Sequence, residues 1–145
     1  MKKKILLLLI SFLFLAPFVF APRNNPAPIN SDDELAYFNR ALSKKDEDPK
    51  GAILDFTKAL SINPKDANAY SNRGILKRLM KDNTGAISDF SRAIALNPSD
   101  AKAYLNRGIA KRSIKDNAGA VLDLEKAKSI FFEQRKLNST SGPKM

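Results

Sequence analysis

The chain has 145 residues, a length that fits a single domain. Lys and Arg number 25 against 15 Asp and Glu, so the formal net charge is +10, and the chain contains no Cys and no His. These absences exclude a disulfide framework, a thiolate or histidine zinc site, and catalytic triads or dyads that use Cys or His. Catalysis would have to rely on Lys, carboxylates, Ser, Thr and Tyr, and we expect no metal and no other cofactor.

The first 21 residues form a targeting segment. Three lysines precede an apolar run from Ile5 to Ala21, which is the order of a secretory signal. The run is 17 residues long, at the short limit for a membrane-spanning helix. Because Pro22 disfavours cleavage after Ala21, a cleaved signal and a retained membrane anchor both remain open. In either case we expect export to a periplasm, a lumen or the extracellular space, with residues 22–30 as a Pro- and Asn-rich linker.

The rest of the chain is an internal repeat with a period of 34 residues. The string AxAYxNRGIxKRxxKDNxGA begins at Ala67 and again at Ala101. A looser first copy lacks one residue before Gly51. The repeated units are residues 34–64, 67–98 and 101–132, and a period of this length is typical of helical arrays.

These units resemble the tetratricopeptide repeat family. The residues at the family positions of the second unit are Tyr70, Arg73, Gly74, Lys77, Ala86, Phe90 and Pro98. Those of the first unit are Tyr37, Arg40, Ala41, Lys44, Ala52, Phe56 and Pro64. Those of the third are Tyr104, Arg107, Gly108, Lys111, Ala120, Leu124 and Phe132, with Phe132 in place of the final Pro. The resemblance implies an all-α, right-handed superhelical solenoid of three helix-turn-helix units over residues 31–137.

Helix starts and apolar spacing agree with this fold. Ser31-Asp32-Asp33-Glu34 predicts a capping box for the first helix, Asp66 and Asp100 predict later N-caps, and Asp48 precedes Pro49 in the same role. Gly74 and Gly108 are small where helices must approach closely. Each second helix carries an apolar stripe, made of Ile53, Phe56, Ala59 and Leu60, then Ile87, Phe90, Ala93 and Ile94, then Val121, Leu124 and Ala127.

In this family the first helix of each unit lines a concave groove that binds a peptide or a partner protein. The repeated Asn39, Asn72 and Asn106 could bond a bound peptide's backbone or a neighbouring helix, and both readings remain open. By resemblance the groove positions are Leu35, Phe38, Asn39, Leu42 and Lys45, then Asn68, Ser71, Asn72, Ile75 and Arg78, then Lys102, Leu105, Asn106, Ile109 and Arg112.

Repeated cations follow the groove positions in every unit. They are Lys44-Lys45, Lys77-Arg78 and Lys111-Arg112, with Arg40, Arg73 and Arg107 beside them. Along one surface they would favour an acidic partner. Alternatively they are solvated residues that interact with the C-terminal dipoles of the first helices. The carboxylates Asp55, Asp89 and Asp123 are expected to be solvated or paired with Lys58 and Arg92.

The residues at the groove positions favour a binding protein that catalyses no reaction. A subclass of the family grips a chaperone's C-terminal carboxylate, but only Asn72 and Lys102 match its set, since Phe38, Leu42 and Asn106 replace the other three residues. No nucleic-acid-binding motif is found. We expect a non-catalytic protein-interaction module, an exported scaffold or adaptor. The alternative is a membrane-tethered factor that assists assembly or maturation of a membrane protein complex, with membrane contact only through the N-terminal segment.

The C-terminal end departs from the family pattern. With Phe132 at the position of the stopping Pro, the last helix is expected to run on to about Asn138, and residues 138–145 to form a disordered tail. Phe131 and Phe132 point about 100° apart on a helix. At least one should therefore stay partly exposed, which makes this end a candidate for self-association.

Overall fold

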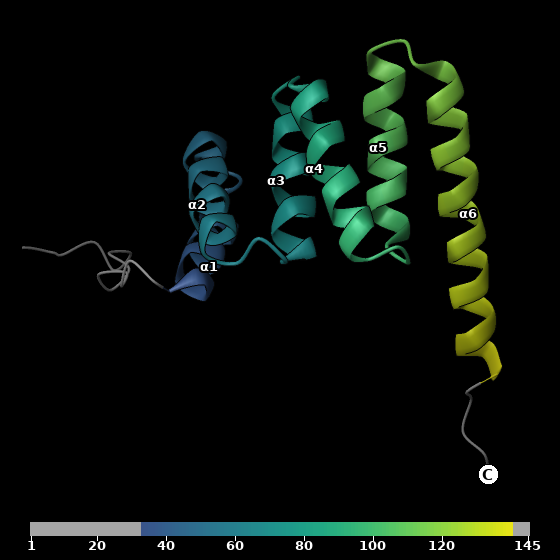
Figure 1. Cartoon of the computed structure of the whole chain (residues 1–145), viewed down its shortest axis with the longest axis horizontal. Helices are drawn as coiled ribbons and strands as arrows, with labels where there is room; N and C mark the ends of the chain where they lie inside the picture. Colours follow the sequence, from purple (N-terminus) through teal and green to yellow (C-terminus); the bar gives the residue numbers. More distant parts are fainter. Residues whose placement is uncertain (1–32, 141–145) are drawn as a thin grey trace, which may run out of the picture.

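The computed structural model describes residues 33–140, which form six helices and no strand. The helices make three successive pairs that stand side by side in chain order (Figure 1). This arrangement confirms the all-α solenoid of three units. The predicted signal or anchor and the linker lie outside the described residues. The pairs are α1 (Glu34–Lys44) with α2 (Pro49–Ile62), α3 (Ala67–Leu79) with α4 (Asn83–Leu96), and α5 (Ala101–Ser113) with α6 (Asn117–Thr140).

An aspartate caps the start of each helix. Asp48, Asp66 and Asp100 accept hydrogen bonds from backbone N–H groups of the first turns of α2, α3 and α5, which confirms the predicted caps. The predicted capping box at Ser31 is wrong, because Asp33 caps α1 and its Oδ1 accepts from Ala36 N at 3.0 Å. Two further caps were missed, Asp82 on α4 and Asp116 on α6.

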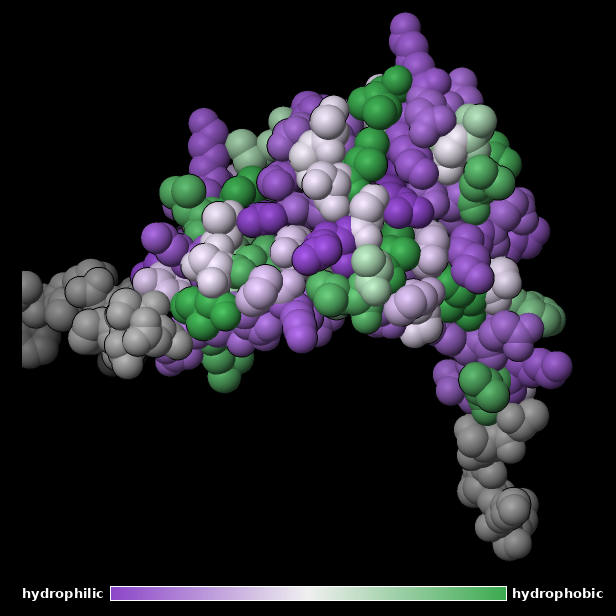
Figure 2. All heavy atoms as spheres, viewed as in Figure 1, coloured by the Kyte–Doolittle hydropathy of each residue, from purple (hydrophilic) through white to green (hydrophobic). Residues whose placement is uncertain are grey.

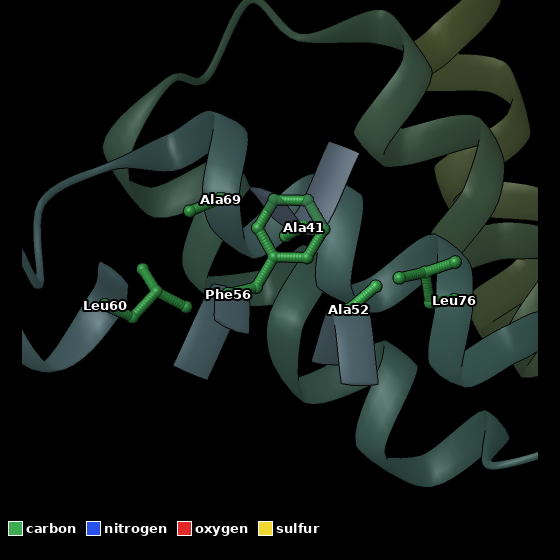
Figure 3. Close-up of a cluster of buried hydrophobic side chains, with 6 residues drawn as sticks. All are labelled: Ala41, Ala52, Phe56, Leu60, Ala69 and Leu76. Atoms are coloured by element: carbon green, nitrogen blue, oxygen red, sulfur yellow. The ribbon is translucent and has the colours of Figure 1, made fainter. Parts of the chain in front are cut away.

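The core consists of small residues packed around one buried aromatic ring in each of the first two units. Phe56 and Phe90 are the largest fully buried side chains. Figure 3 shows Phe56 surrounded by buried alanines and leucines from α1, α2 and α3. Gly74 is needed for close approach, since a Cβ there would lie 2.9 Å from Phe90 Cε1. The apolar stripes of α2 and α4 are confirmed, but Val121 of α6 is 59% exposed, since no later helix within residues 33–140 covers it.

The turn inside the first unit is one residue shorter than the other two. In the second and third units Lys81 and Lys115 adopt positive φ values of 68° to link the two helices. The backbone N–H of Asp82 then bonds Lys77 O, five residues back. In the first unit Asp48 N bonds Lys44 O, four residues back. The residue missing before Gly51 is therefore the one that takes the left-handed conformation elsewhere.

The last helix continues well beyond its partner, and its end projects from the body of the solenoid (Figure 1). α6 extends to Thr140, past Phe132 as expected and two residues beyond the predicted end near Asn138. The predicted disordered tail is thus wrong for Ser139 and Thr140, and residues 141–145 lie outside the described part. Phe131 and Phe132 are 42% and 67% exposed, which confirms that at least one of them stays open to solvent.

Candidate functional site

Each unit holds one buried carboxylate between two cations of its own first helix. In the second unit Asp89 is only 4% exposed, and it accepts from Arg73 Nε at 2.9 Å and Arg73 Nη2 at 2.7 Å. Lys77 Nζ lies 2.8 Å from Oδ2 of the same carboxylate, the oxygen that also accepts from Arg73 Nε. The Arg73 guanidinium also stacks over the Tyr70 ring, 5.6 Å from its centroid.

The same cluster recurs in the other two units. Asp55 is bound by Arg40 and Lys44, and Asp123 by Arg107 and Lys111. The prediction that these aspartates are solvated or paired with Lys58 and Arg92 is therefore wrong. Each outer helix turns its aspartate inward against the first helix, where an unpaired carboxylate would be costly.

The clusters of the first and third units favour the ionised form of their carboxylates. Burial acts to raise the pKa of Asp55, but hydrogen bonds from Arg40 and the positive charges of Arg40 and Lys44 outweigh it, so the pKa lies below its ordinary value. Burial likewise acts to raise the pKa of Asp123, but hydrogen bonds from Arg107 and Lys111 and their positive charges outweigh it, so this pKa is lowered as well. Hydrogen bonding to Asp55 in turn raises the pKa of Arg40 against the opposing effect of burial.

Two of the arginines also join neighbouring units. Arg73 Nη1 donates to Thr57 Oγ1 on the preceding α2 at 3.0 Å. Arg107 Nη1 donates to Ser91 Oγ on the preceding α4 at 3.1 Å. Six of the repeated cations are thus structural, and the predicted cationic surface is reduced to the remaining member of each pair, which are Lys45, Arg78 and Arg112.

The candidate binding site is a pocket of about 560 Å³ on the concave side of the second and third units. Its walls come from α3, the α4–α5 turn, α5 and the end of α6. Figure 2 shows apolar residues scattered among polar ones on the visible surface, so the molecule offers no broad apolar face in this view. The predicted groove residues that the structure brings together here are Asn68, Ser71, Asn72, Ile75, Lys102 and Asn106.

Amide groups give the pocket its polar character. Asn72 Nδ2 donates to Asn68 O and Asn106 Nδ2 donates to Lys102 O, each at 2.9 Å and each within its own helix. The amides therefore do not bond a neighbouring helix as one reading had it. Because the NH2 groups turn back to the backbone, each side chain points its carbonyl oxygen away as a hydrogen-bond acceptor.

Charge in the pocket is dominated by one lysine. The carboxylate of Asp100 is engaged, because it caps α5 through Ala103 N at 3.0 Å and accepts from Ser71 Oγ at 3.2 Å. Lys102 is exposed and forms no salt bridge within residues 33–140. The pocket wall thus carries one ammonium group and one carboxylate; neutral donors occupy the carboxylate, whereas the ammonium group of Lys102 has no salt-bridge partner within residues 33–140.

Several predicted site residues lie outside this pocket. Phe38 packs edge-on against Phe56, with ring centroids 5.4 Å apart, so it belongs to the core. Arg78 keeps its Nε buried without a hydrogen-bond partner in the described part of the chain. The predicted residues that do not line the pocket are Leu35, Phe38, Asn39, Leu42, Lys45, Arg78, Leu105, Ile109 and Arg112.

The pocket also contains residues that the repeat pattern did not predict. Phe131 and Gln134 of α6 close one side, and Gln134 Nε2 bonds Ser99 O at 3.1 Å. The signal for this wall was the loss of the final Pro, since Phe131 occupies the position of Asn97 one unit earlier. The other unpredicted lining residues are Phe90, Asn97, Ser99, Asp100, Ala101 and Ala103.

Within residues 33–140, no group of three or more acidic residues is arranged to hold a metal ion. Over the same residues no helix has the length and apolar character to cross a membrane.

Comparison with known proteins supports the repeat. The family model described as tetratricopeptide repeat matches residues 67–100. No curated protein sequence matches the chain. Among solved structures, that of MamA superposes with a TM-score of 0.71 at 23% identity, covering 74% of this chain and 63% of that chain. This chain therefore spans less than two thirds of MamA's length.

Two isolated repeat domains give similar agreement. The first TPR domain of Spaghetti (RPAP3), bound to the HSP90 peptide SRMEEVD, has a TM-score of 0.66 at 25% identity and covers 79% of this chain and 98% of that one. The Arabidopsis OM64 TPR domain has a TM-score of 0.65 at 22% identity and covers 67% and 81%. Residues 67–100 thus match the tetratricopeptide repeat family, and the three helix pairs of the chain share the fold of these solved repeat structures.

Proposed function

We propose that the chain is a non-catalytic protein-interaction module and that its concave pocket binds an extended peptide segment of a partner protein. The observation that carries this proposal is the pocket of about 560 Å³, with amide acceptors from two successive first helices. An extended peptide exposes backbone N–H groups along its length, and Asn72 and Asn106 offer carbonyl oxygens to them. The Phe131 ring supplies an apolar wall for a peptide side chain.

An acidic peptide fits this pocket best. Lys102 is the unpaired charge of the wall, whereas the Asp100 carboxylate is already bound. The similar domain of Spaghetti is bound to the peptide SRMEEVD, which contains three acidic residues. Here Asn72 and Lys102 match the carboxylate-binding set of that subclass, so acidic segments should bind more weakly than in a domain with the full set.

Binding of a labelled acidic heptapeptide, SRMEEVD, tests the proposal by fluorescence anisotropy, with its neutral variant SRMQQVN as control. We expect the acidic peptide to bind, and Lys102→Ala or the pair Asn72→Ala/Asn106→Ala to weaken it by about tenfold, as loss of one or two polar contacts would. Lys58→Ala, on the exposed side of α2, should have no effect. Equal binding of both peptides, or binding that ignores the pocket substitutions, would contradict the proposal.

The cations outside the pocket provide a second measurement. If Lys45, Arg78 and Arg112 attract an acidic partner at longer range, changing all three to Glu should weaken binding while the far-UV helix signal is retained. Raised salt should weaken binding in the same way. Unchanged binding under both conditions would assign these cations to solvated helix ends.

The location of the protein completes the proposal. The basic and apolar N-terminus supports an exported scaffold or adaptor, and a retained segment would support the alternative of a membrane-tethered assembly or maturation factor. The mass of the native N-terminus distinguishes the two, because cleavage after Ala21 leaves Pro22 as the first residue. An intact N-terminus on a membrane-bound chain would favour the tethered factor.

A further inference from the structure

The two ends of the solenoid carry complementary versions of the contacts that join its units. Inside the molecule, each junction pairs three positions of a second helix with three positions of the next first helix. The hydroxyl position is Thr57 or Ser91, and it accepts from Arg73 or Arg107. Apolar positions lie on either side of the hydroxyl. At the first junction Leu60 shares a cluster with Ala69, and Ile53 packs against the cluster that contains Leu76. At the second junction Ile94 shares a cluster with Ala103, and Ile87 packs against the cluster that contains Ala110.

At the N-terminal end no helix within residues 33–140 packs on the corresponding three positions in the way that a second helix does at an internal junction. We call this head face Ala36, Arg40 and Ser43 of α1, which stand in the repeat where Ala69, Arg73 and Leu76 stand in α3. Arg40 uses its Nε and Nη2 on Asp55, as Arg73 does on Asp89. Within residues 33–140, however, no hydroxyl accepts from Arg40 Nη1, since α1 is the first helix of this part of the chain.

At the C-terminal end the matching positions are also open. We call this tail face Val121, Glu125 and Lys128 of α6, which stand in the repeat where Ile87, Ser91 and Ile94 stand in α4. Val121 is 59% exposed, whereas Ile87 is partly buried against the next unit. Glu125 is exposed and forms no salt bridge in the described part of the chain.

The charges of the two faces fit each other in this register. At an internal junction an arginine donates to a hydroxyl group. At the contact between two copies, Arg40 of one copy would take the arginine position and Glu125 of the other copy the hydroxyl position. Where Ile94 packs with Ala103, Lys128 would meet Ala36 at the acidic start of α1, which contains Asp33 and Glu34. Both contacts join opposite charges, which fixes register and orientation more than it adds affinity.

We propose that the tail face of one copy docks on the head face of a second copy, so that the solenoid continues from chain to chain. Such a contact is head-to-tail and does not close on itself, so it builds short open filaments. The polar residues Ser43 and Lys128 replace Leu76 and Ile94 of the internal junctions and make the contact weaker and reversible. Of the aromatic pair, Phe131 lines the pocket, whereas Phe132 follows Lys128 by four residues and continues the tail face along α6.

Disulfide cross-linking tests the register, because the chain has no Cys of its own. The full chain, kept in mild detergent because residues 1–21 are apolar, carries Ser43→Cys and Val121→Cys, which the proposed contact brings together. Mild oxidation should give a series of dimers, trimers and longer species. Chains with Ser43→Cys and Leu54→Cys, an exposed outer-face residue, measure random encounter. If the cross-linked yield is no greater than this background, the proposal is overturned. The same result is expected if residues 22–32 of the same chain cover the head face, so that case also counts against the proposal.

Substitutions at Glu125 test the charge pairing without touching the internal cluster of Arg40. Glu125→Arg should reduce the cross-linked fraction at least about fivefold, because two arginines would then face each other. Glu125→Thr should leave most of it intact, since threonine accepts from arginine at the internal junction of Thr57. Lys128→Ile, which restores the internal residue, should increase the yield. An unchanged yield with Glu125→Arg, or a yield lost only with Phe132→Glu, would overturn the proposal.

Discussion

Removal of the central buried charge should destabilise the whole solenoid. Asp89 is 4% exposed and receives two hydrogen bonds from Arg73 and a charge contact from Lys77. Asp89→Asn leaves both cations without a counter-charge and sets an amide NH2 against their donors. Breaking a buried pair in this way costs about 3–5 kcal/mol. Because the Arg73 and Lys77 side chains keep 14% and 21% exposure, we expect the lower end, about 3 kcal/mol.

Urea unfolding followed by circular dichroism at 222 nm measures this loss as a lower midpoint at an unchanged slope. Asp46→Asn, at an exposed carboxylate in the α1–α2 turn, is the matched control and should change stability by less than about 0.5 kcal/mol. Adding Arg73→Ala to Asp89→Asn should cost less than Arg73→Ala alone, since the two residues share one interaction. An effect of Asp89→Asn below about 1 kcal/mol would refute the view that the buried cluster stabilises the fold.

Three further changes are predicted from the turn, the close helix contact and the ionised carboxylates. Lys81→Gly should stabilise the fold by about 1 kcal/mol, since its φ of 68° is unfavourable for a side chain, whereas Glu47→Gly in the shorter turn should not; thermal unfolding checks both. Gly74→Ala should cost about 1–3 kcal/mol despite alanine's helix propensity, because the new Cβ would lie 2.9 Å from the fully buried Phe90 ring; urea unfolding measures the loss. The pKa of Asp55 is lowered on folding, so its stabilisation is present above the ordinary carboxyl pKa of about 4 and is lost as pH falls through the folded value. With no His in the chain, the melting temperature should stay level from about pH 5.5 to 8 and fall below about pH 4, and a drop centred near pH 6.5 would contradict this reasoning.

The repeat, the helix pairs and most caps could be predicted because they depend on local sequence. A 34-residue period, Asp before each helix and apolar spacing all act within one unit. The buried clusters could not be assigned in this way, although Asp89, Arg73 and Lys77 recur visibly in every unit. Whether a carboxylate on an outer helix faces solvent or its partner helix depends on how the two helices are rotated, and the spacing of apolar residues fixes that rotation only approximately.

The pocket was predicted in part for a similar reason. Asn72, Lys102 and Asn106 share one face of successive first helices, so the repeat places them together. The wall formed by Phe131 depends on a helix that continues beyond the repeat and lies against the α4–α5 turn, where Gln134 bonds Ser99 O. No feature of the repeat specifies that contact. The earlier units end at Asn-Pro instead and leave their groove side open.

The double bonding of the arginines gives the array a polarity that its nearly identical units do not suggest. Arg73 bonds Asp89 within its own unit and Thr57 in the unit before it. If the third unit opens, Arg73 keeps every one of these acceptors. If the first unit opens, Arg73 loses Thr57 and the second unit is weakened as well. Each such arginine thus contributes both to the stability of its own unit and to the interface with the unit before it. The intrinsic stability of a unit and its interface energy, which are separate in a simple one-dimensional array, are therefore coupled. Opening the third unit also breaks one such bond, between Arg107 and Ser91, but the arginine that loses its acceptor then lies in the open unit. Opening the first unit instead leaves Arg73 of the folded remainder short of one acceptor, and amide exchange at the two ends compares these events.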